Sequence, residues 1–214
     1  SGLHIVCLQA STGAIQWDVA LEGSADAVMA TSTCVLAASS VYDIEHNDFI
    51  ESAIWSISFD GDVLATHRID ERPWTLQPYN QGAIAGLGRP LNGYLILDAN
   101  GDILEQSKDW ESPTICATRG ENPVFGLADG SVRSMDGALV GSMQSAISSV
   151  LKHPDGYLLA DDQGNIEFVH NDVKWNASGN DVVASSLGFD INEKGSCWVA
   201  RWNGSQGEII VHSI

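Results

Sequence analysis

The sequence lacks the patterns that mark several large classes of protein. No run of about eighteen apolar residues occurs, so we expect no membrane span. Gly-x-Ser-x-Gly, P-loop and dinucleotide-binding motifs are absent as well, and the sequence therefore names no catalytic residue and no bound nucleotide. Basic residues are scarce, with 10 Lys and Arg against 28 Asp and Glu, which gives a formal charge of −18. Because this charge repels phosphate groups at long range, we expect no nucleic-acid partner.

The acidity has two interpretations. It either keeps a surface soluble at high salt or forms an acidic face that recruits a basic partner. The four cysteines, Cys7, Cys34, Cys116 and Cys197, are widely separated, lie in apolar stretches and form no Cys-x-x-Cys pair. We expect free thiols that act as small buried hydrophobes, which favours a reducing, cytoplasmic compartment over a disulfide-bonded one.

Two groups of residues resemble metal ligands only superficially. Asp98, Asn100 and Asp102 alternate as at the start of an EF-hand loop, but the positions where that loop needs Gly and Glu hold Ile103 and Asp109. A hairpin turn explains the same residues. The histidines His4, His67, His170 and His212 lie in predicted strands among apolar neighbours. We therefore predict no metal site and no cofactor.

Short apolar strands and tight turns recur along the whole chain. Hairpin turns are predicted near residues 13, 61, 101, 137 and 171, and most contain Asp-Gly, Asn-Gly or Thr-Gly, which favour positive φ. Two further strands precede each complete hairpin, so four strands repeat about every 40 residues. The first interval is longer because residues 41–52, "VYDIEHNDFIES", are inserted. This spacing predicts an all-β protein, a β-propeller built from four-stranded antiparallel blades in a single domain, residues 1–214.

One repeat carries a family motif. "HIVCLQASTGAIQWDV" resembles a quinoprotein-type (PQQ-like) propeller repeat through Thr12, Gly13 and Trp17, whereas "GNIEFVHNDVKW" keeps only Trp175. WD40-type propellers have a similar blade layout, although no correctly spaced Gly-His and Trp-Asp pair occurs here. The resemblance implies a propeller. The quinone-dependent dehydrogenases of that family carry adjacent cysteines and calcium-binding carboxylates, which this chain lacks, so no quinone cofactor is implied.

The strand order predicts how a ring could close. The chain begins with the last two strands of one blade, continues through four complete blades and ends with three more strands. Those three strands could join the first two and close a five-bladed ring with one strand to spare, which would remove exposed sheet edges. Six or seven blades are the alternative if the chain is a fragment or if two chains share a blade.

Aromatic and acidic residues are predicted to gather on one rim of the propeller. Trp74 and Trp110 are expected in links between blades, on the same rim as a loop formed by residues 41–52. Aromatic residues and arginine supply much of the energy of protein interfaces, and carboxylates can steer a basic partner. Glu51 and Glu71 are expected on this rim beside the candidate binding residues, which are Tyr42, Asp43, Glu45, His46, Asp48, Phe49, Asp70, Arg72, Trp74, Asp109, Trp110 and Glu111.

These features favour a non-enzymatic propeller that binds a protein or peptide through this rim and serves as a scaffold. The alternative interpretation of the rim is that both tryptophans fold back onto the blades and the acids only solvate the surface. A hydrolase or lyase with carboxylates and histidines in the central channel is the enzyme alternative. A structural fragment of a larger propeller protein is the third.

Overall fold

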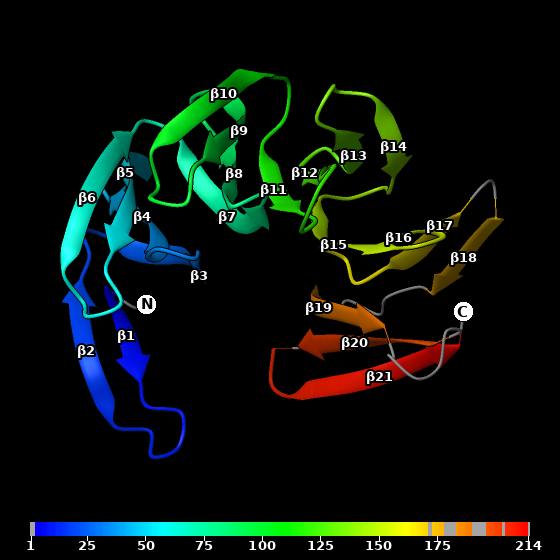
Figure 1. Cartoon of the computed structure of the whole chain (residues 1–214). Coiled ribbons are helices and arrows are strands. Elements are labelled where there is room, and N and C mark those ends of the chain that lie inside the picture. The colour runs from blue at the N-terminus through cyan, green and yellow to red at the C-terminus, as the bar shows by residue number, and fades with distance from the viewer. Residues whose placement is uncertain (1–2, 171–172, 178–182, 190–195, 203, 214) are drawn as a thin grey trace. The chain divides into compact units, whose positions relative to one another are not determined.

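In the computed structural model, the described residues form strands, turns and bends, with no helix among them. The structure describes residues 3–170, 173–177, 183–189, 196–202 and 204–213. No described segment forms a helix that is long and apolar enough to cross a membrane. The chain divides into two compact units, Ser1–Thr114 and Ile115–Ile214, and each is described by itself. Figure 1 shows the strands of both units.

Unit 1 contains three antiparallel sheets. The first sheet has two strands, β1 (His4–Leu8) and β2 (Ile15–Ala20). The second has four in chain order, β3 (Ser24–Ala30), β4 (Val35–Asp43), β5 (Asp48–Ile57) and β6 (Val63–Ile69). The third follows the same order with β7 (Arg72–Tyr79), β8 (Gly82–Gly88), β9 (Asn92–Leu97) and β10 (Ile103–Trp110).

Unit 2 repeats this arrangement. Strand β11 (Thr114–Ala117), which starts at the boundary residue, pairs with β12 (Val124–Leu127), and β13 (Ser131–Ser134) and β14 (Leu139–Ser142) complete that sheet. The next sheet consists of β15 (Ile147–His153), β16 (Gly156–Asp161), β17 (Ile166–His170) and β18 (Val173–Ala177). The last has three strands, β19 (Val183–Phe189), β20 (Ser196–Trp202) and β21 (Gly207–Ser213).

The core of unit 1 lies between sheets that pack face to face. Successive side chains of a strand point to opposite faces, and in β4 both faces are buried. Ala37 joins Val19 in a cluster shared with the first sheet. Leu36 and Ala38 join Leu95 in a cluster shared with the third sheet. The middle sheet is therefore apolar on both faces, as a sheet between two others must be.

Glycine turns bring neighbouring sheets of unit 1 into contact. Gly101, at φ 90° in the turn between β9 and β10, has no side chain to keep it away from the second sheet. A Cβ there would overlap Ser56 Oγ and lie 2.7 Å from Leu36 Cδ2. The same turn is held by the Ser56 hydroxyl, which donates to the Asn100 carbonyl at 2.5 Å. Only glycine combines this backbone conformation with so close an approach.

The Asp98 carboxylate is used inside this turn. One of its oxygens accepts the backbone N–H groups of Asn100 at 2.8 Å and Asp102 at 3.0 Å. This is the turn chemistry that favours Asp at the end of a strand. The hairpin interpretation of the "DANGD" segment thus accounts for the carboxylate that an EF-hand would need as its first ligand.

The all-β class and the four-stranded antiparallel sheets confirm the sequence prediction, and the strands group as predicted, with a pair first, four complete sheets and three strands last. Gly13, Gly61, Gly101 and Gly137 all have positive φ in hairpin turns. The turn predicted near residue 171 falls at residues 171–172, outside the described residues. The number of blades, closure of a ring and the single domain remain predictions. All four cysteines are free, and Cys34 and Cys197 are buried.

Replacing Gly101 with alanine tests the close approach of the turn. We expect Gly101→Ala to lower the free energy of unfolding by about 2 to 4 kcal/mol, from positive-φ strain and overlap with Ser56 and Leu36. The matched control is Gly13→Ala, because Gly13 has φ 71° but nothing within 4 Å of its Cβ position. It should cost about 1 kcal/mol. Urea unfolding followed by tryptophan fluorescence measures both, and equal losses would contradict the docking of the turn.

Candidate functional site

Residues 41–52 form a strand hairpin, which corrects the predicted loop. Strands β4 and β5 stay paired from Val35↔Ile57 out to Asp43↔Asp48 and leave only residues 44–47 as the tip. The paired segment extends beyond its neighbours, since β3 last pairs at Ser24↔Ser40 and β6 at Ser52↔Ile69. Tyr42 and Phe49, both strand-favouring residues, lie opposite each other, which explains why the segment stays extended.

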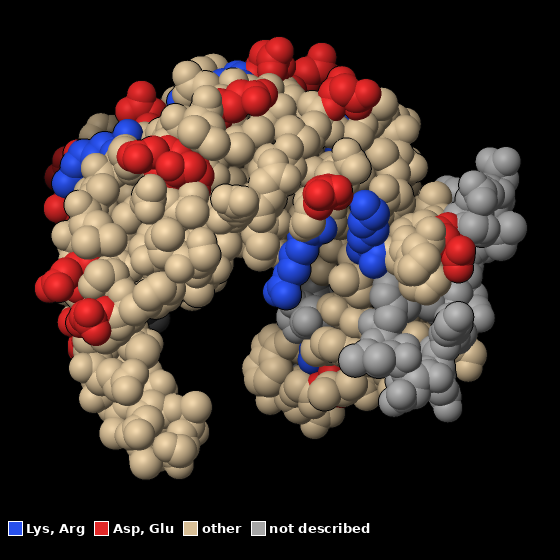
Figure 2. All heavy atoms as spheres, in the orientation of Figure 1, with Lys and Arg blue, Asp and Glu red and all other residues tan. Residues whose placement is uncertain are grey.

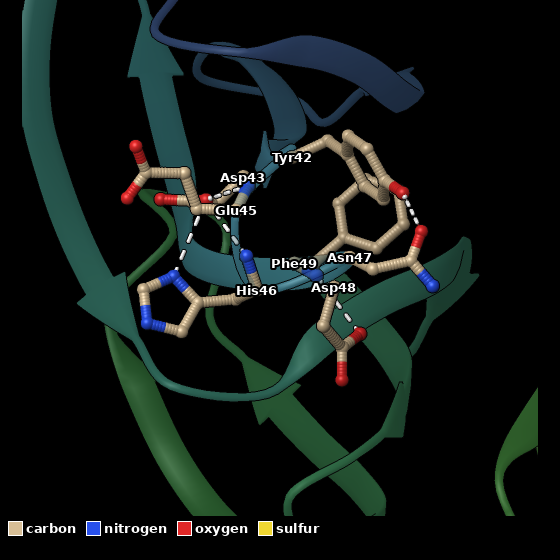
Figure 3. A network of polar contacts seen from close by, with 7 residues as sticks. All are labelled: Tyr42, Asp43, Glu45, His46, Asn47, Asp48 and Phe49. Atoms are coloured by element: carbon tan, nitrogen blue, oxygen red, sulfur yellow. Dashed lines mark hydrogen bonds and ion pairs between the residues drawn. The ribbon is translucent and has the colours of Figure 1, made fainter.

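The tip is organised by the Asp43 carboxylate (Figure 3). One Asp43 oxygen accepts the backbone N–H groups of Glu45 at 2.7 Å and His46 at 3.0 Å, and it lies 3.2 Å from His46 Nδ1. These contacts lower the pKa of Asp43 from its usual 3.8, with the His46 backbone N–H as the largest cause. Asp43 is therefore committed to the turn rather than available to a partner.

Two aromatic rings stack along one face of the hairpin. The Tyr42 and Phe49 rings meet edge to face with their centroids 5.3 Å apart, and the Tyr42 hydroxyl donates to Asn47 Oδ1 at 2.6 Å. Figure 3 shows both rings on the same side of the ribbon. Edge-to-face pairs of this kind stabilise beyond the area that they bury. Side-chain contacts thus continue along this face up to the tip.

Arg72, in β7, fixes the hairpin against the third sheet. Its guanidinium carbon lies 3.7 Å from the centroid of the Phe49 ring and 3.9 Å from that of Trp74, so the cation is sandwiched between two aromatic faces. A planar guanidinium stacks on rings in this way whereas an ammonium does not. Arg72 is therefore a positioning residue for Phe49 and Trp74, in contrast to the exposed contact residue predicted from the sequence.

A buried carboxylate that the sequence analysis missed neutralises Arg72. Asp26 in β3 has a side chain only 8% exposed, and Arg72 donates to its Oδ1 at 2.9 Å. Its Oδ2 accepts a hydrogen bond from Ser40, whose Oγ in turn accepts from Ser52 Oγ at 3.2 Å. Both oxygens of the buried anion are thus satisfied, as a buried carboxylate requires. Asp26 lies in an apolar stretch, and nothing in its local sequence indicates a partner.

Neither tryptophan lies in a link between sheets, which corrects that prediction. Trp74 is part of β7 and Trp110 is the last residue of β10. Trp74 is 37% exposed beside Arg72, and its indole packs on Gly88, where a Cβ would lie 2.6 Å from Nε1. Trp110 is half-buried, with its ring edge to face with Tyr94 at a centroid distance of 5.7 Å. Trp110 thus follows the alternative interpretation, in which the indole folds onto its own sheet.

The acidic residues have several different environments. Glu71, predicted on the rim, is 2% exposed and pairs with Lys108 Nζ at 2.8 Å, because a buried carboxylate needs a cation. Asp48 lies 3.6 Å from Arg89 Nη2, and Asp109 accepts a hydrogen bond from Ser107 Oγ at 2.9 Å. Asp70 and Glu111 are exposed. Figure 2 shows further acidic side chains spread over the surface above β6 and β10.

The exposed apolar residues around the hairpin form one candidate surface. We call it the hairpin surface and define it as Tyr42 (48% exposed), Ile44 (86%), Ile50 (45%) and Trp74 (37%). Ile44 is in the tip, and Ile50 is the extra residue of a β-bulge in β5, which turns its side chain away from the pleat. Four of the predicted residues form a chain of contacts in the order Tyr42, Phe49, Arg72 and Trp74. The side chains of Glu45 and His46 lie on the other side of the tip from the two rings (Figure 3). Neither isoleucine was predicted.

Nothing in the described part of the chain gathers three or more His, Cys, Asp or Glu side chains as a metal ion would require. The arrangement instead offers rigid aromatic and aliphatic contact area beside carboxylates.

Comparisons with known proteins show likeness in structure alone. No protein-family model matches the sequence, and no curated protein matches it. The crystal structure of Saccharomyces cerevisiae Sqt1 is similar over 99% of this chain and 66% of its own, with a TM-score of 0.73 and 10% identity. The computationally designed protein Ika8 is similar over 95% of this chain and 75% of its own, with a TM-score of 0.62 and 15% identity. Together with the four-stranded sheets, these likenesses fit a propeller-like fold.

Arg72→Lys tests the guanidinium sandwich. Lysine keeps the charge but cannot stack its head between two rings, so we expect the free energy of unfolding to fall by about 1 to 2 kcal/mol. Arg68→Lys is the matched control, because Arg68 is 56% exposed and pairs with Glu22 at 2.5 Å on the surface. It should change stability by less than about 0.5 kcal/mol. Urea titrations of both variants would refute the sandwich if the two losses were alike.

The tip should respond to acid. Because the pKa of Asp43 is lower in the folded chain than its usual 3.8, the ionised carboxylate stabilises the turn at higher pH, and this contribution is lost as the pH falls through the folded value. Carboxyl-detected NMR should give Asp43 a midpoint below 3.8, accompanied by faster amide exchange at Glu45 and His46. A midpoint at or above the usual value would contradict the role of Asp43. In Asp43→Asn, the acid-dependent change in exchange should disappear.

Proposed function

We propose that the chain is a non-enzymatic protein- or peptide-binding module that uses the hairpin surface to hold its partner. The observation that carries this proposal is the combination of four exposed apolar side chains with a rigid mount. Tyr42 and Trp74 lie at the two ends of the stack that Phe49 and Arg72 complete. A surface that is rigid before binding loses less entropy when a partner docks on it.

The charges around the hairpin surface favour a basic partner. Glu45 and Glu51 are exposed at or beside the hairpin, and Asp70 is exposed just before β7. The overall charge of −18 adds a long-range attraction for cationic segments. The partner is therefore expected to present Lys or Arg beside aliphatic or aromatic residues. A propeller-like fold is compatible with this role, because its rigid sheets position the connecting segments that select partners.

Affinity capture from a lysate of the source organism tests this function. We expect the double variant Tyr42→Ala with Ile44→Ser to lose about tenfold or more of the captured partner, since exposed aromatic and aliphatic anchors supply most of the energy at interfaces. The control is Val28→Ser, which removes an exposed aliphatic residue, 54% exposed, on β3. Equal capture by the double variant would refute this surface. Failure of the unaltered chain to capture any protein above a control bait would refute the function itself.

A photo-crosslinking residue would place the contact directly. A cross-linker at position 44 should label the captured partner, whereas the same group at position 28 should not. Cross-links of equal yield from both positions would contradict a localised contact. Circular dichroism of each variant verifies that the strands are intact.

A further inference from the structure

A second apolar surface lies at the opposite end of the second sheet from the hairpin surface. Strand β5 runs from the hairpin tip at Asp48 to Ile57, where the turn into β6 begins, so the two ends are about 30 Å apart. At this far end, the outer strands β6 and β10 each start with two exposed aliphatic residues. Val63 is 47% and Leu64 60% exposed in β6, and Ile103 is 39% and Leu104 67% exposed in β10.

The exposure of both leucines has the same structural cause. The register of β5 and β6 passes from Ile57↔Val63 to Ser56↔Ala65, which leaves Leu64 without an opposite residue. The register of β9 and β10 passes from Leu97↔Ile103 to Ile96↔Glu105, which leaves Leu104 without an opposite residue as well. Each leucine is thus the extra residue of a β-bulge, a device that re-aims a side chain and disrupts strand pairing at an edge. At this end of the two sheets, the edge strands therefore expose leucine side chains to a partner instead of a regular row of backbone hydrogen-bonding groups.

Polar contacts hold these neighbouring strands against one another. The Trp17 indole N–H of β2 donates to the Phe59 carbonyl at 2.8 Å, which places the turn before β6 against β2. His67 Nε2 of β6 lies 3.3 Å from Asp102 Oδ1, next to the start of β10. We call the resulting surface the outer-strand strip and define it as Ile15, Phe59, Val63, Leu64, Ile103 and Leu104.

The outer-strand strip is bordered by negative charge. Residues 14–20, 58–66 and 98–106, which contain the strip, include no Lys or Arg but carry Asp18, Asp60, Asp62, Asp98, Asp102 and Glu105. Asp60 and Asp62 are exposed, and Asp102 has a side chain 65% exposed. Figure 2 shows acidic side chains over the start of β6. Contiguous apolar patches rimmed by charge are uncommon on proteins that act alone and mark interaction sites.

We propose that the outer-strand strip is a second docking site, which takes an amphipathic, basic polypeptide segment. Such a segment covers the six apolar side chains with its own aliphatic face and places Lys or Arg beside Asp60, Asp62 and Asp102. Charge complementarity selects this occupant over a second copy of the chain, which would bring carboxylates against carboxylates. For the same reason the strip does not suit an anionic membrane surface.

The test uses the full chain and a fluorescein-labelled synthetic helix with leucines on one face and lysines on the other. Fluorescence anisotropy should show binding that weakens as salt is added, because the carboxylates contribute. Leu64→Ser with Leu104→Ser should weaken the affinity by about tenfold or more, since two aliphatic contacts are lost. Leu139→Ser is the matched control, because Leu139 also starts an outer strand, β14, and is 62% exposed. It should leave the affinity unchanged.

A second pair of variants tests the charges without touching the apolar residues. Asp60→Asn with Asp62→Asn should weaken binding and reduce its dependence on salt. The same helix with glutamates in place of lysines should not bind. Equal affinity of the double-leucine variant, or equal binding of the glutamate helix, would overturn the proposal. So would self-association of the chain, or binding to vesicles of anionic lipid, that is lost in the double-leucine variant.

This proposal and the proposed function fail independently. Because the hairpin surface is also proposed to hold a basic partner, the helix is tested again in the background of Tyr42→Ala with Ile44→Ser, where binding should persist and should still be lost on adding Leu64→Ser with Leu104→Ser. A loss of helix binding in that variant would show that the outer-strand strip is not the site.

Discussion

The structure of unit 1 depends on one constraint, which is that its middle sheet must be buried on both faces. Ala37 and Leu36 are neighbours in β4 yet belong to two different apolar clusters. Each cluster is completed by an adjacent sheet, so no sheet of this unit is a folding unit with a core of its own. The turn at Gly101 follows from the same constraint, because sheets that pack this closely leave room for backbone but not for a side chain.

The same close packing determines where polar groups can lie. Asp26 is buried at the junction of two sheets and requires a cation, and Arg72 reaches it from the next sheet between two aromatic rings. Glu71 meets the same requirement through Lys108. These two buried ion pairs thus position the hairpin and the start of β7. The exposed apolar residues lie on the strands that the ion pairs hold in place.

The sequence predicted what local chemistry determines and missed what distant contacts determine. The turn glycines and the four-strand period were predictable because Asp-Gly and Asn-Gly specify a turn within a few residues. The pairing of Arg72 with Asp26 was not, since 46 residues separate them and no local pattern marks a buried aspartate. Likewise, Trp74 and Trp110 were predicted in links between blades, whereas both lie within strands whose ends are set by pairing with neighbouring strands. Bulge positions such as Ile50 depend on register, which only pairing reveals.

The tip of the hairpin has a consequence for engineering. Residues 44–47 form the tip beyond the Tyr42–Phe49 ring pair. The strands below the tip are held by their own pairing and by that ring pair, so they do not depend on the identity of Ile44. A short foreign peptide inserted there would be displayed on a rigid stalk, with its two ends held at the separation of neighbouring strands, about 5 Å. The chain thereby provides a natural scaffold for presenting loops of chosen sequence.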